Sequence, residues 1–277
     1  NSQIQLAFIN GTNAYDKSLI FDWVKEMCQA VASIGGQFPI KEIQVLVILQ
    51  KSGSGAVPWG QVNRGGVPGV LFIVNPESTK QELMQDWTAA HEFSHLLVPY
   101  TPEDRWLSEG FASYYQNISR ARTGLLDEKS TWEKLLSGFN RGSIAASSAN
   151  APMLKSANMR SLMQMYWGGA AIALKAEVEL LKHSSGKMNL SDAIKGLNEC
   201  CLHTGRSWTA KQTFEQMDEI TGTNIFSELY HQEVLGSKFP DYKSIFKELG
   251  ISKSRYGGIQ FEDSEAKAAL RYKVIKG

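Results

Sequence analysis

Two histidines with a glutamate beside the first mark the segment of this sequence whose residue types could do chemistry. Residues 91–95 read HEFSH, which places His91 and His95 at positions i and i+4. On a helix these positions lie one turn apart on the same face, so both imidazoles can bind one metal ion. Glu92 lies about 100° further round the helix, which directs its carboxylate to a water on that metal rather than to the metal itself. The spacing therefore predicts a catalytic zinc centre in which Glu92 is the general base.

A second motif supplies a candidate third ligand. A catalytic zinc ion usually has three protein ligands and one open position. Residues 106–115 read WLSEGFASYY, and they place Glu109 in a helical segment of its own, with thirteen residues between it and His95. We therefore expect one zinc ion per chain, bound by His91, His95 and Glu109.

Other kinds of metal site fit the sequence less well. A structural zinc site would favour cysteine ligands and a closed fourth position. Cys28, Cys200 and Cys201 are far from the motif in sequence, lack C-x-x-C spacing and do not form a disulfide framework. One class of H-E-x-x-H zinc enzymes uses a third histidine as the remaining ligand, in the pattern H-E-x-x-H-x-x-G-x-x-H. That pattern would need glycine at position 98 and histidine at position 101, where this chain has Val98 and Thr101. That class is excluded.

The flanking residues predict two helices that would position these side chains. Residues 80–98 contain no glycine or proline, so we expect one continuous helix there, ended by Pro99. A second helix is expected to begin near Thr101, a capping residue followed by Pro102, and to end at Gly124.

These motifs resemble the gluzincin metallopeptidases, specifically the catalytic domains of aminopeptidase N-type enzymes and of the related glycyl aminopeptidases. The residues that carry the resemblance are HEFSH at 91–95, WLSEGFASYY at 106–115 and YWGGA at 166–170. The resemblance implies that His91, His95 and Glu109 are zinc ligands and that Glu92 is the general base. It also implies that the Tyr166 hydroxyl stabilises the tetrahedral oxyanion of a peptide or protein substrate.

The sequence departs from the family in three places. The spacer between His95 and Glu109 is shorter than in aminopeptidase N-type enzymes, and Gly168 stands where their tyrosine motif has lysine. Those enzymes also carry an acidic residue in a glycine-rich segment before the zinc helix, which binds the substrate's free α-amine. The comparable residues here, 64–74, contain no carboxylate.

The glycine-rich segment is nevertheless the expected substrate-binding region. An extended peptide can pair with an edge strand through backbone groups alone, and we expect residues 70–74 to be that strand. The candidate substrate-binding residues are Gly65, Gly66, Val67 and Gly69. A buried ammonium group without a carboxylate partner is costly, so we expect weak or absent preference for a free N-terminus. Glu77 could reach back to supply a carboxylate, although an acid is expected there for helix-dipole reasons alone.

The pattern of the chain predicts an α+β fold. Residues 4–9 and 43–49 are typical of buried strands, with a helix over 18–33 between them. We expect residues 53–69 to form a glycine-rich loop and residues 137–161 to form a loop that joins two lobes. The resemblance implies a thermolysin-like catalytic domain: a small mixed sheet packed on the zinc helix, plus a mostly helical C-terminal lobe. The expected division is a metal-binding subdomain over 1–125 and a lobe over 126–277 that closes the cleft.

Composition agrees with a soluble enzyme. The chain has 277 residues, 43% of them hydrophobic and 21% charged, which is enough to build a substantial core. A net charge of +1 does not indicate nucleic-acid binding, and no apolar stretch is long enough to span a membrane. Because the chain begins at Asn1 without a signal-peptide pattern, we expect it to be processed or to be part of a longer protein.

Two other functions would use the same residues. A zinc hydrolase of an epoxide or ester would need every side chain named above. A catalytically silent scaffold is the non-enzyme alternative, but it would be expected to have lost the base or a ligand.

Overall fold

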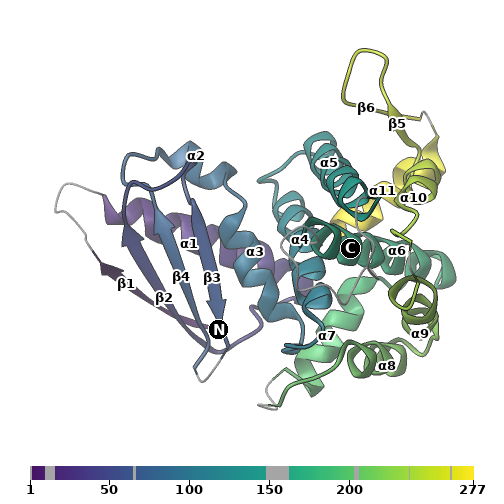
Figure 1. Ribbon diagram of the computed structural model, residues 1–277, viewed down its shortest axis with the longest axis horizontal. Coiled ribbons are helices and arrows are strands. Elements are labelled where there is room, and N and C mark those ends of the chain that lie inside the picture. The colour runs from purple at the N-terminus through teal and green to yellow at the C-terminus, as the bar shows by residue number, and fades with distance from the viewer. Residues whose placement is uncertain are drawn as a thin grey trace.

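The structure is a computed structural model that describes residues 2–9, 16–64, 67–147, 162–202, 206–236, 238–262 and 264–277. A four-stranded sheet with one long helix against it makes up one side of the molecule, and a larger group of helices makes up the other (Figure 1). The predicted combination of a small mixed sheet and a mostly helical C-terminal part is confirmed. The division of the chain at residue 125 stays a prediction.

The sheet has three parallel strands and one antiparallel strand. Its order is β1 (Gln3–Ile9), β2 (Glu42–Leu49), β4 (Gly69–Val74) and β3 (Trp59–Asn63), and β3 runs antiparallel to β4. Alternate residues of β2 and β4 are buried, as period-two side-chain geometry requires. The two predicted strands at the start of the chain are confirmed, although β1 is an edge strand that is only partly buried.

Helix α1 (Lys17–Gly35) connects β1 to β2 and covers one face of the sheet, where Trp23 packs edge-on against Phe72 of β4 with ring centroids 5.1 Å apart. The Asp16 side chain accepts the Ser18 N–H at its start, and Gly36 ends it in the left-handed conformation. The predicted helix over 18–33 is confirmed.

The glycine-rich segment folds differently from the expectation. Residues 53–69 contain strand β3, and β4 is paired on both sides, with β2 and with β3. The predicted strand at 70–74 is confirmed as β4, but its predicted edge position is wrong, because β3 takes the outer position. The short β3 alternates exposed and partly buried residues and includes Gly60, which makes it hard to tell from a loop in sequence.

The predicted continuous helix over 80–98 is broken into α2 (Lys80–Gln85), α3 (Thr88–Ser94) and the 3-10 turn η1 (His95–Leu97). Asp86 has an extended ψ of 143°, and its carboxylate accepts the Thr88 N–H at 2.7 Å. Nη2 of Arg120 donates to the Gln85 carbonyl at 2.8 Å, which satisfies a carbonyl at the end of α2. Side-chain hydrogen bonds thus make a helix break that no glycine or proline signals.

The second predicted helix forms as α4 (Arg105–Arg122), with Asp104 rather than Thr101 at its N-cap position. It packs against α3 and against α6 (Leu162–His183). The α4–α6 contact is made by two glycines: a methyl group added at Gly110 would lie 2.9 Å from the Ala170 nitrogen and still closer to the backbone of Gly169. The two backbones therefore touch at this point.

Helix α5 (Glu128–Ser147) corrects the prediction of a loop over 137–161. Its glycines lie against an aromatic side chain of α6, since a methyl group at Gly138 would overlap the Trp167 ring and one at Gly142 would lie 2.6 Å from the Trp167 Cβ. Close packing thus overrides the helix-breaking tendency of glycine. The rest of the predicted loop, residues 148–161, lies outside the described residues.

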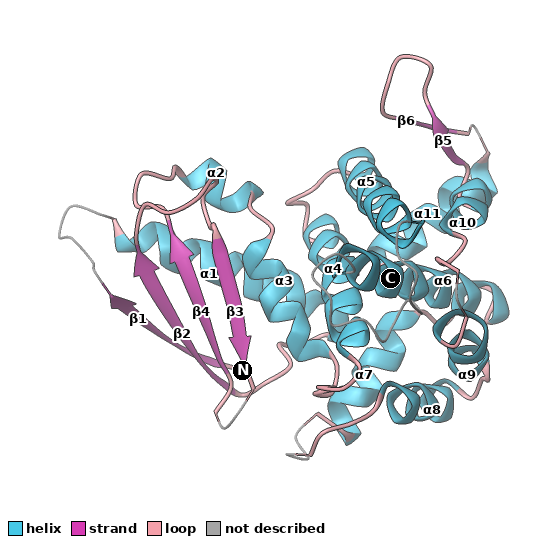
Figure 2. Ribbon diagram, in the orientation of Figure 1, coloured by secondary structure: helices cyan, strands magenta, loops and turns pink. Residues whose placement is uncertain are grey.

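The remaining described elements complete the helical side (Figure 2). They are α7 (Leu190–Cys200), α8 (Ala210–Thr221), α9 (Ile225–Leu229), the π-turn η3 (Tyr230–Val234), α10 (Tyr242–Glu248), the hairpin of β5 (Ile251–Lys253) and β6 (Ile259–Phe261), and α11 (Glu265–Lys276). Cys200 and Cys201 are joined by a disulfide, a link between sequence neighbours that the sequence analysis did not expect. None of the helices in the described ranges combines the length and apolar character that a membrane span requires.

We predict that Gly169→Ala destabilises the protein. The added methyl group would overlap the Trp106 carbonyl oxygen and lie 2.8 Å from the Gly110 Cα, and backbone atoms cannot move aside as a flexible side chain can. The overpacking cost should exceed the gain in helix propensity and lower the free energy of unfolding by about 1–3 kcal/mol, measured by urea denaturation. As a control, Gly196→Ala adds a methyl group whose three nearest atoms all belong to the Ile220 side chain, which can shift, so this change should cost less. Equal stability of Gly169→Ala and the native chain would show that the contact is not tight.

Candidate metal centre

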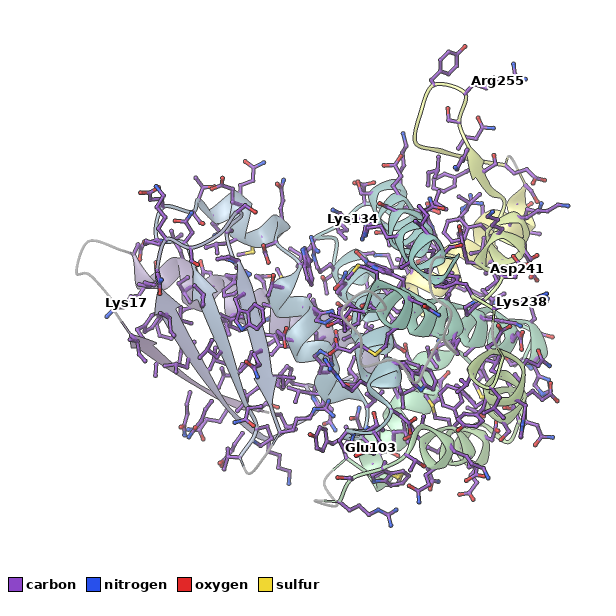
Figure 3. All side chains as sticks on the ribbon, in the orientation of Figure 1. Lys17, Glu103, Lys134, Lys238, Asp241 and Arg255 are labelled. Atoms are coloured by element: carbon purple, nitrogen blue, oxygen red, sulfur yellow. A yellow bond between two sulfur atoms is a disulfide. The ribbon has the colours of Figure 1, made fainter. Side chains whose placement is uncertain are left out.

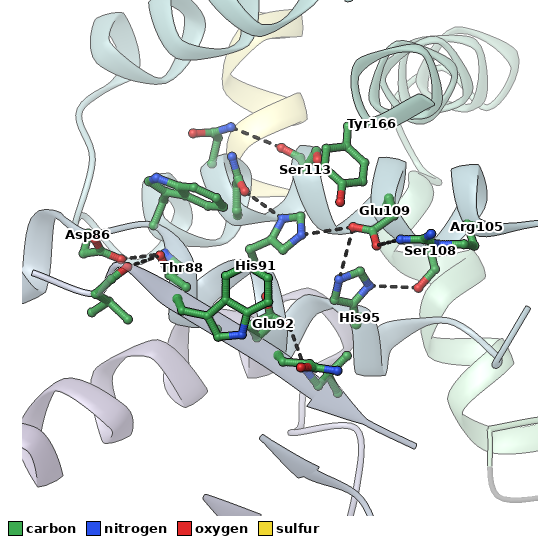
Figure 4. Close-up of a pocket in the computed structure, with 18 of the residues that line it drawn as sticks. Asp86, Thr88, His91, Glu92, His95, Arg105, Ser108, Glu109, Ser113 and Tyr166 are labelled. Carbon is green, nitrogen blue, oxygen red and sulfur yellow. Dashed lines mark hydrogen bonds and ion pairs between the residues drawn. The ribbon is translucent and has the colours of Figure 1, made fainter. Parts of the chain in front are cut away.

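Three donor atoms from two helical segments converge in the cavity between the sheet and the helical side (Figure 4). Oε2 of Glu109, on α4, lies 3.3 Å from Nε2 of His91 and 3.5 Å from Nε2 of His95. His91 lies on α3, and His95 follows directly in the 3-10 turn, so the break after α3 does not separate the pair. All three side chains are largely shielded from solvent.

Each histidine uses its other ring nitrogen for a hydrogen bond. Nδ1 of His91 lies 2.9 Å from the Gln116 side-chain oxygen, and Nδ1 of His95 lies 2.8 Å from the Ser108 hydroxyl. Because the Gln116 oxygen can only accept, His91 carries a proton on Nδ1, and its Nε2 faces Glu109. Burial holds the pKa of His95 well below its usual value, so its imidazole is neutral. Both imidazoles are thus held in an orientation that would suit metal ligands.

This donor set fits a zinc ion. Ligands at zinc distances of about 2.0–2.1 Å in a tetrahedron lie about 3.3–3.4 Å from one another, which matches the separations between Glu109 and the two imidazoles. Two imidazole nitrogens and one carboxylate are also a common ligand set of catalytic zinc, which leaves the fourth position open.

Glu92 lies beside these atoms and is also near enough to be a ligand, since donor atoms of His91, Glu92 and His95 all lie within 4.8 Å of one another. Its carboxylate is held by the sheet instead, because Oε2 accepts the Val62 N–H of β3 at 2.8 Å. Glu109 is therefore the better candidate for a third ligand. Burial raises the pKa of the Glu92 carboxyl.

A glycine allows β3 to approach Glu92. A methyl group at Gly60 would lie 2.7 Å from the Glu92 Cγ and 2.6 Å from the Thr88 Cγ2. The hydrogen bond between Val62 and Glu92 thus depends on a residue without a side chain two positions earlier in the strand.

Tyr166 enters the site from α6. Its ring lies 6.2 Å from the His91 ring between centroids, and its hydroxyl points toward Glu109 and the two histidines (Figure 4). Burial and then the negative charge of Glu109 raise the pKa of Tyr166 to about 12, so the hydroxyl keeps its proton at neutral pH. Tyr114 and Tyr115 are fully buried in the core and do not line the cavity.

The cavity around these residues has a volume of about 1460 Å³ and is bounded by β3, α3, α4, α5 and α6. Every residue of β3 lines it, and β3 is one of the two edge strands of the sheet, so one of its edges is open. Among the candidate substrate-binding residues, Val67 is exposed and Gly69 pairs within the sheet, and neither is a lining residue. Gly65 and Gly66 lie outside the described residues.

Sequence reasoning did not find the partners of the histidines. Gln116 follows Glu109 by seven positions, two turns along α4, so helical periodicity places it on the face of Glu109 and could have found it. Ser108 carries no comparable signal, because its contact with His95 depends on how η1 and α4 pack.

We predict that Gln116→Ala weakens zinc binding. Loss of the hydrogen bond frees the His91 ring to rotate and to change its tautomer, which should raise the zinc dissociation constant about 10–100-fold in a chelator competition. Asn117→Ala is the matched control: Asn117 is the adjacent buried amide, and its Nδ2 donates to the Ser113 backbone rather than to a histidine. Equal zinc affinity of the two variants would contradict the role of Gln116.

Comparison with known proteins adds a structural relationship. No family model matches the chain, and no curated protein matches it either. Among solved structures, an aminopeptidase N family protein from Idiomarina loihiensis matches with a TM-score of 0.66 at 19% identity, over 90% of this chain and 47% of that chain. An M1 zinc metallopeptidase from Deinococcus radiodurans matches with a TM-score of 0.50 at 16% identity, over 84% of this chain and 49% of that one. A mutant of that enzyme bound to a Tyr-Ser-Ala substrate gives a TM-score of 0.52 at 15% identity.

The chain spans about half the length of the solved structures it matches. At these identities the likeness is one of fold, and it agrees with the family resemblance that the sequence motifs predict. The chain has the fold of the M1 aminopeptidase N family of zinc metallopeptidases and carries a His-Glu-x-x-His site within it.

Proposed function

We propose that this protein is a zinc-dependent peptidase with a thermolysin-like active site. The observation that carries the proposal is the convergence of His91, His95 and Glu109 on one point, with the Glu92 carboxylate beside it. In this proposal His91, His95 and Glu109 hold one zinc ion, Glu92 is the general base and Tyr166 stabilises the oxyanion.

The open edge of β3 favours a peptide over an epoxide or a small ester. In an antiparallel pair the backbone groups of alternate residues face away from the partner strand. The Val62 N–H faces away from β4, toward Glu92. The backbone groups of Gly60, two residues earlier, also face away from β4. An extended substrate can pair with this edge and so bring a backbone carbonyl to the metal centre.

The reaction follows from the positions of the side chains. Zinc bound here would act as a Lewis acid that polarises the scissile carbonyl and increases the acidity of water. Glu92 accepts the proton of the attacking water and passes it to the leaving amine. The Tyr166 hydroxyl donates a hydrogen bond to the oxygen on which negative charge develops. Burial of these groups strengthens each of their electrostatic interactions.

We predict that Glu92→Gln abolishes most turnover and keeps the metal. The amide oxygen can still accept the Val62 N–H, but an amide cannot take up the water's proton, so kcat should fall by about 100-fold or more. The zinc content of each variant distinguishes the role of a general base from that of a ligand. Glu92→Gln should keep its zinc, whereas His95→Ala should lose most of its zinc. Full turnover of Glu92→Gln, or full zinc occupancy of His95→Ala, would sink the corresponding assignment.

We predict that Tyr166→Phe lowers kcat by about 100-fold or more and changes KM little, the pattern of an interaction made mainly in the transition state. Steady-state kinetics of the zinc-loaded variant are the measurement. Tyr100→Phe is the matched control, because Tyr100 is the other tyrosine among the described residues that line the cavity. Tyr100→Phe should leave kcat largely unchanged. If Tyr100→Phe shows the large loss of kcat instead and Tyr166→Phe does not, the oxyanion donor is Tyr100.

A further inference from the structure

The carboxylates of the cavity are already engaged. Its described lining contains three, on Asp86, Glu92 and Glu109. Glu92 and Glu109 belong to the proposed metal centre, and Asp86 accepts the Thr88 N–H at 2.7 Å where α3 begins. None of these three groups is therefore left to hold a substrate's ammonium group.

Two other places where an ammonium partner could be expected lack one as well. Strand β3, which takes the edge position, reads WGQVN and has no acidic residue. Glu77 does not line the cavity and instead forms an exposed ion pair with Lys51 at 2.6 Å.

Four cationic side chains line the same cavity: Arg64, Arg105, Lys134 and Arg141. Arg105 lies 3.6 Å from the second carboxylate oxygen of Glu109 and is balanced by it (Figure 4). Arg141 lies over the Trp167 ring at 5.1 Å and donates to Ser137. Lys134 is an exposed residue on the side of α5 that faces the sheet (Figure 3).

Arg64 follows β3 directly and differs from the other three. Its Nη1 donates to the Val98 carbonyl at 3.1 Å, and its guanidinium lies 5.9 Å from the centroid of the Tyr100 ring. Its Nη2 is shielded from solvent and has no hydrogen-bond partner, and among the described residues no carboxylate lies within 4.0 Å of it. Burial lowers the pKa of Arg64 to about 10, so the side chain is positively charged at neutral pH.

Arg64 lines the same cavity as the candidate metal ligands His91, His95 and Glu109. A buried guanidinium nitrogen without a partner is costly, and the planar guanidinium group matches a carboxylate in geometry. The site thus presents an unused carboxylate-binding group where β3 would guide a substrate.

We propose that Arg64 binds a carboxylate of the substrate next to the scissile bond, so that the preferred substrates are acidic peptides rather than peptides anchored by a free amine. The carboxylate is supplied by an acidic side chain or by the peptide's C-terminus. This proposal rests on the proposed peptidase function and adds the substrate class to it.

The test compares matched peptides on the native enzyme and on Arg64→Met, both loaded with zinc. Mass analysis of a peptide library first locates the cleaved bond. Peptides that differ only by Glu or Gln at one position near that bond then give the ratio of kcat/KM values, and C-terminal acid and amide forms give a second ratio. We expect one of the two ratios to be at least about tenfold in the native enzyme and to fall toward one in Arg64→Met.

Control variants separate Arg64 from a general charge effect. Lys134→Met removes another cation of the same cavity, and we expect it to keep most of the preference. The proposal is overturned if Arg64→Met retains the preference, if Lys134→Met loses it instead, or if the native enzyme shows no such preference. N-terminal acetylation of the best peptide should leave its cleavage largely intact, and cleavage abolished by acetylation would reveal an amine anchor and overturn it too.

Failure of the peptidase function would be recognised separately. If the zinc-loaded native enzyme cleaves no peptide in the library, the proposed function fails. The Arg64 proposal is then decided by binding alone: N-acetylglutamate should bind to the native protein at least about tenfold more tightly than to Arg64→Met, whereas N-acetylglutamine should not distinguish them. Equal binding of N-acetylglutamate to both proteins overturns the Arg64 proposal.

Discussion

The contact between Gly110 and Gly169 is the constraint on which the active-site geometry depends. It brings the backbones of α4 and α6 together at a distance that no side chain would permit. Glu109 directly precedes one glycine, and Tyr166 lies almost one turn before the other. The carboxylate and the phenol therefore reach the same cavity because two helices touch where neither has a Cβ atom.

The same helix α4 also fixes the histidines. Ser108 and Gln116 each hold one imidazole through its Nδ1 atom, and Glu109 faces both Nε2 atoms. One helix thus contributes a ligand candidate and both orienting groups, and a shift of α4 would disturb all of them together. Because the site is buried, the cost of an unpaired polar atom is high, which favours a single arrangement of these side chains.

On the opposite wall, β3 has two roles at once. Its Val62 N–H holds Glu92, and its open edge lies along the cavity where an extended chain can pair. The strand then leads directly into Arg64, so the element that would align a substrate also carries the cation that would recognise it. In the proposed function, one short strand would therefore both align the substrate and carry the residue that recognises its charge.

The sequence by itself determined the local geometry of the candidate metal site. Residues at i and i+4 face the same side of a helix whatever surrounds it, so His91 and His95 were predictable, and Glu109 followed from its own helical segment. The parallel strands and α1 were equally visible, because each has a strong hydrophobic period.

Tertiary structure alone decided the features that arise between segments distant in the chain. Arg120 and Asp86 break the zinc helix, Trp167 fills the space beside the glycines of α5, and β3 rather than β4 takes the sheet edge. Each outcome depends on a hydrogen bond or a close contact between residues that are not neighbours in sequence. Such contacts leave no periodic pattern, since they are set by which surfaces meet and not by the order of residues within one element.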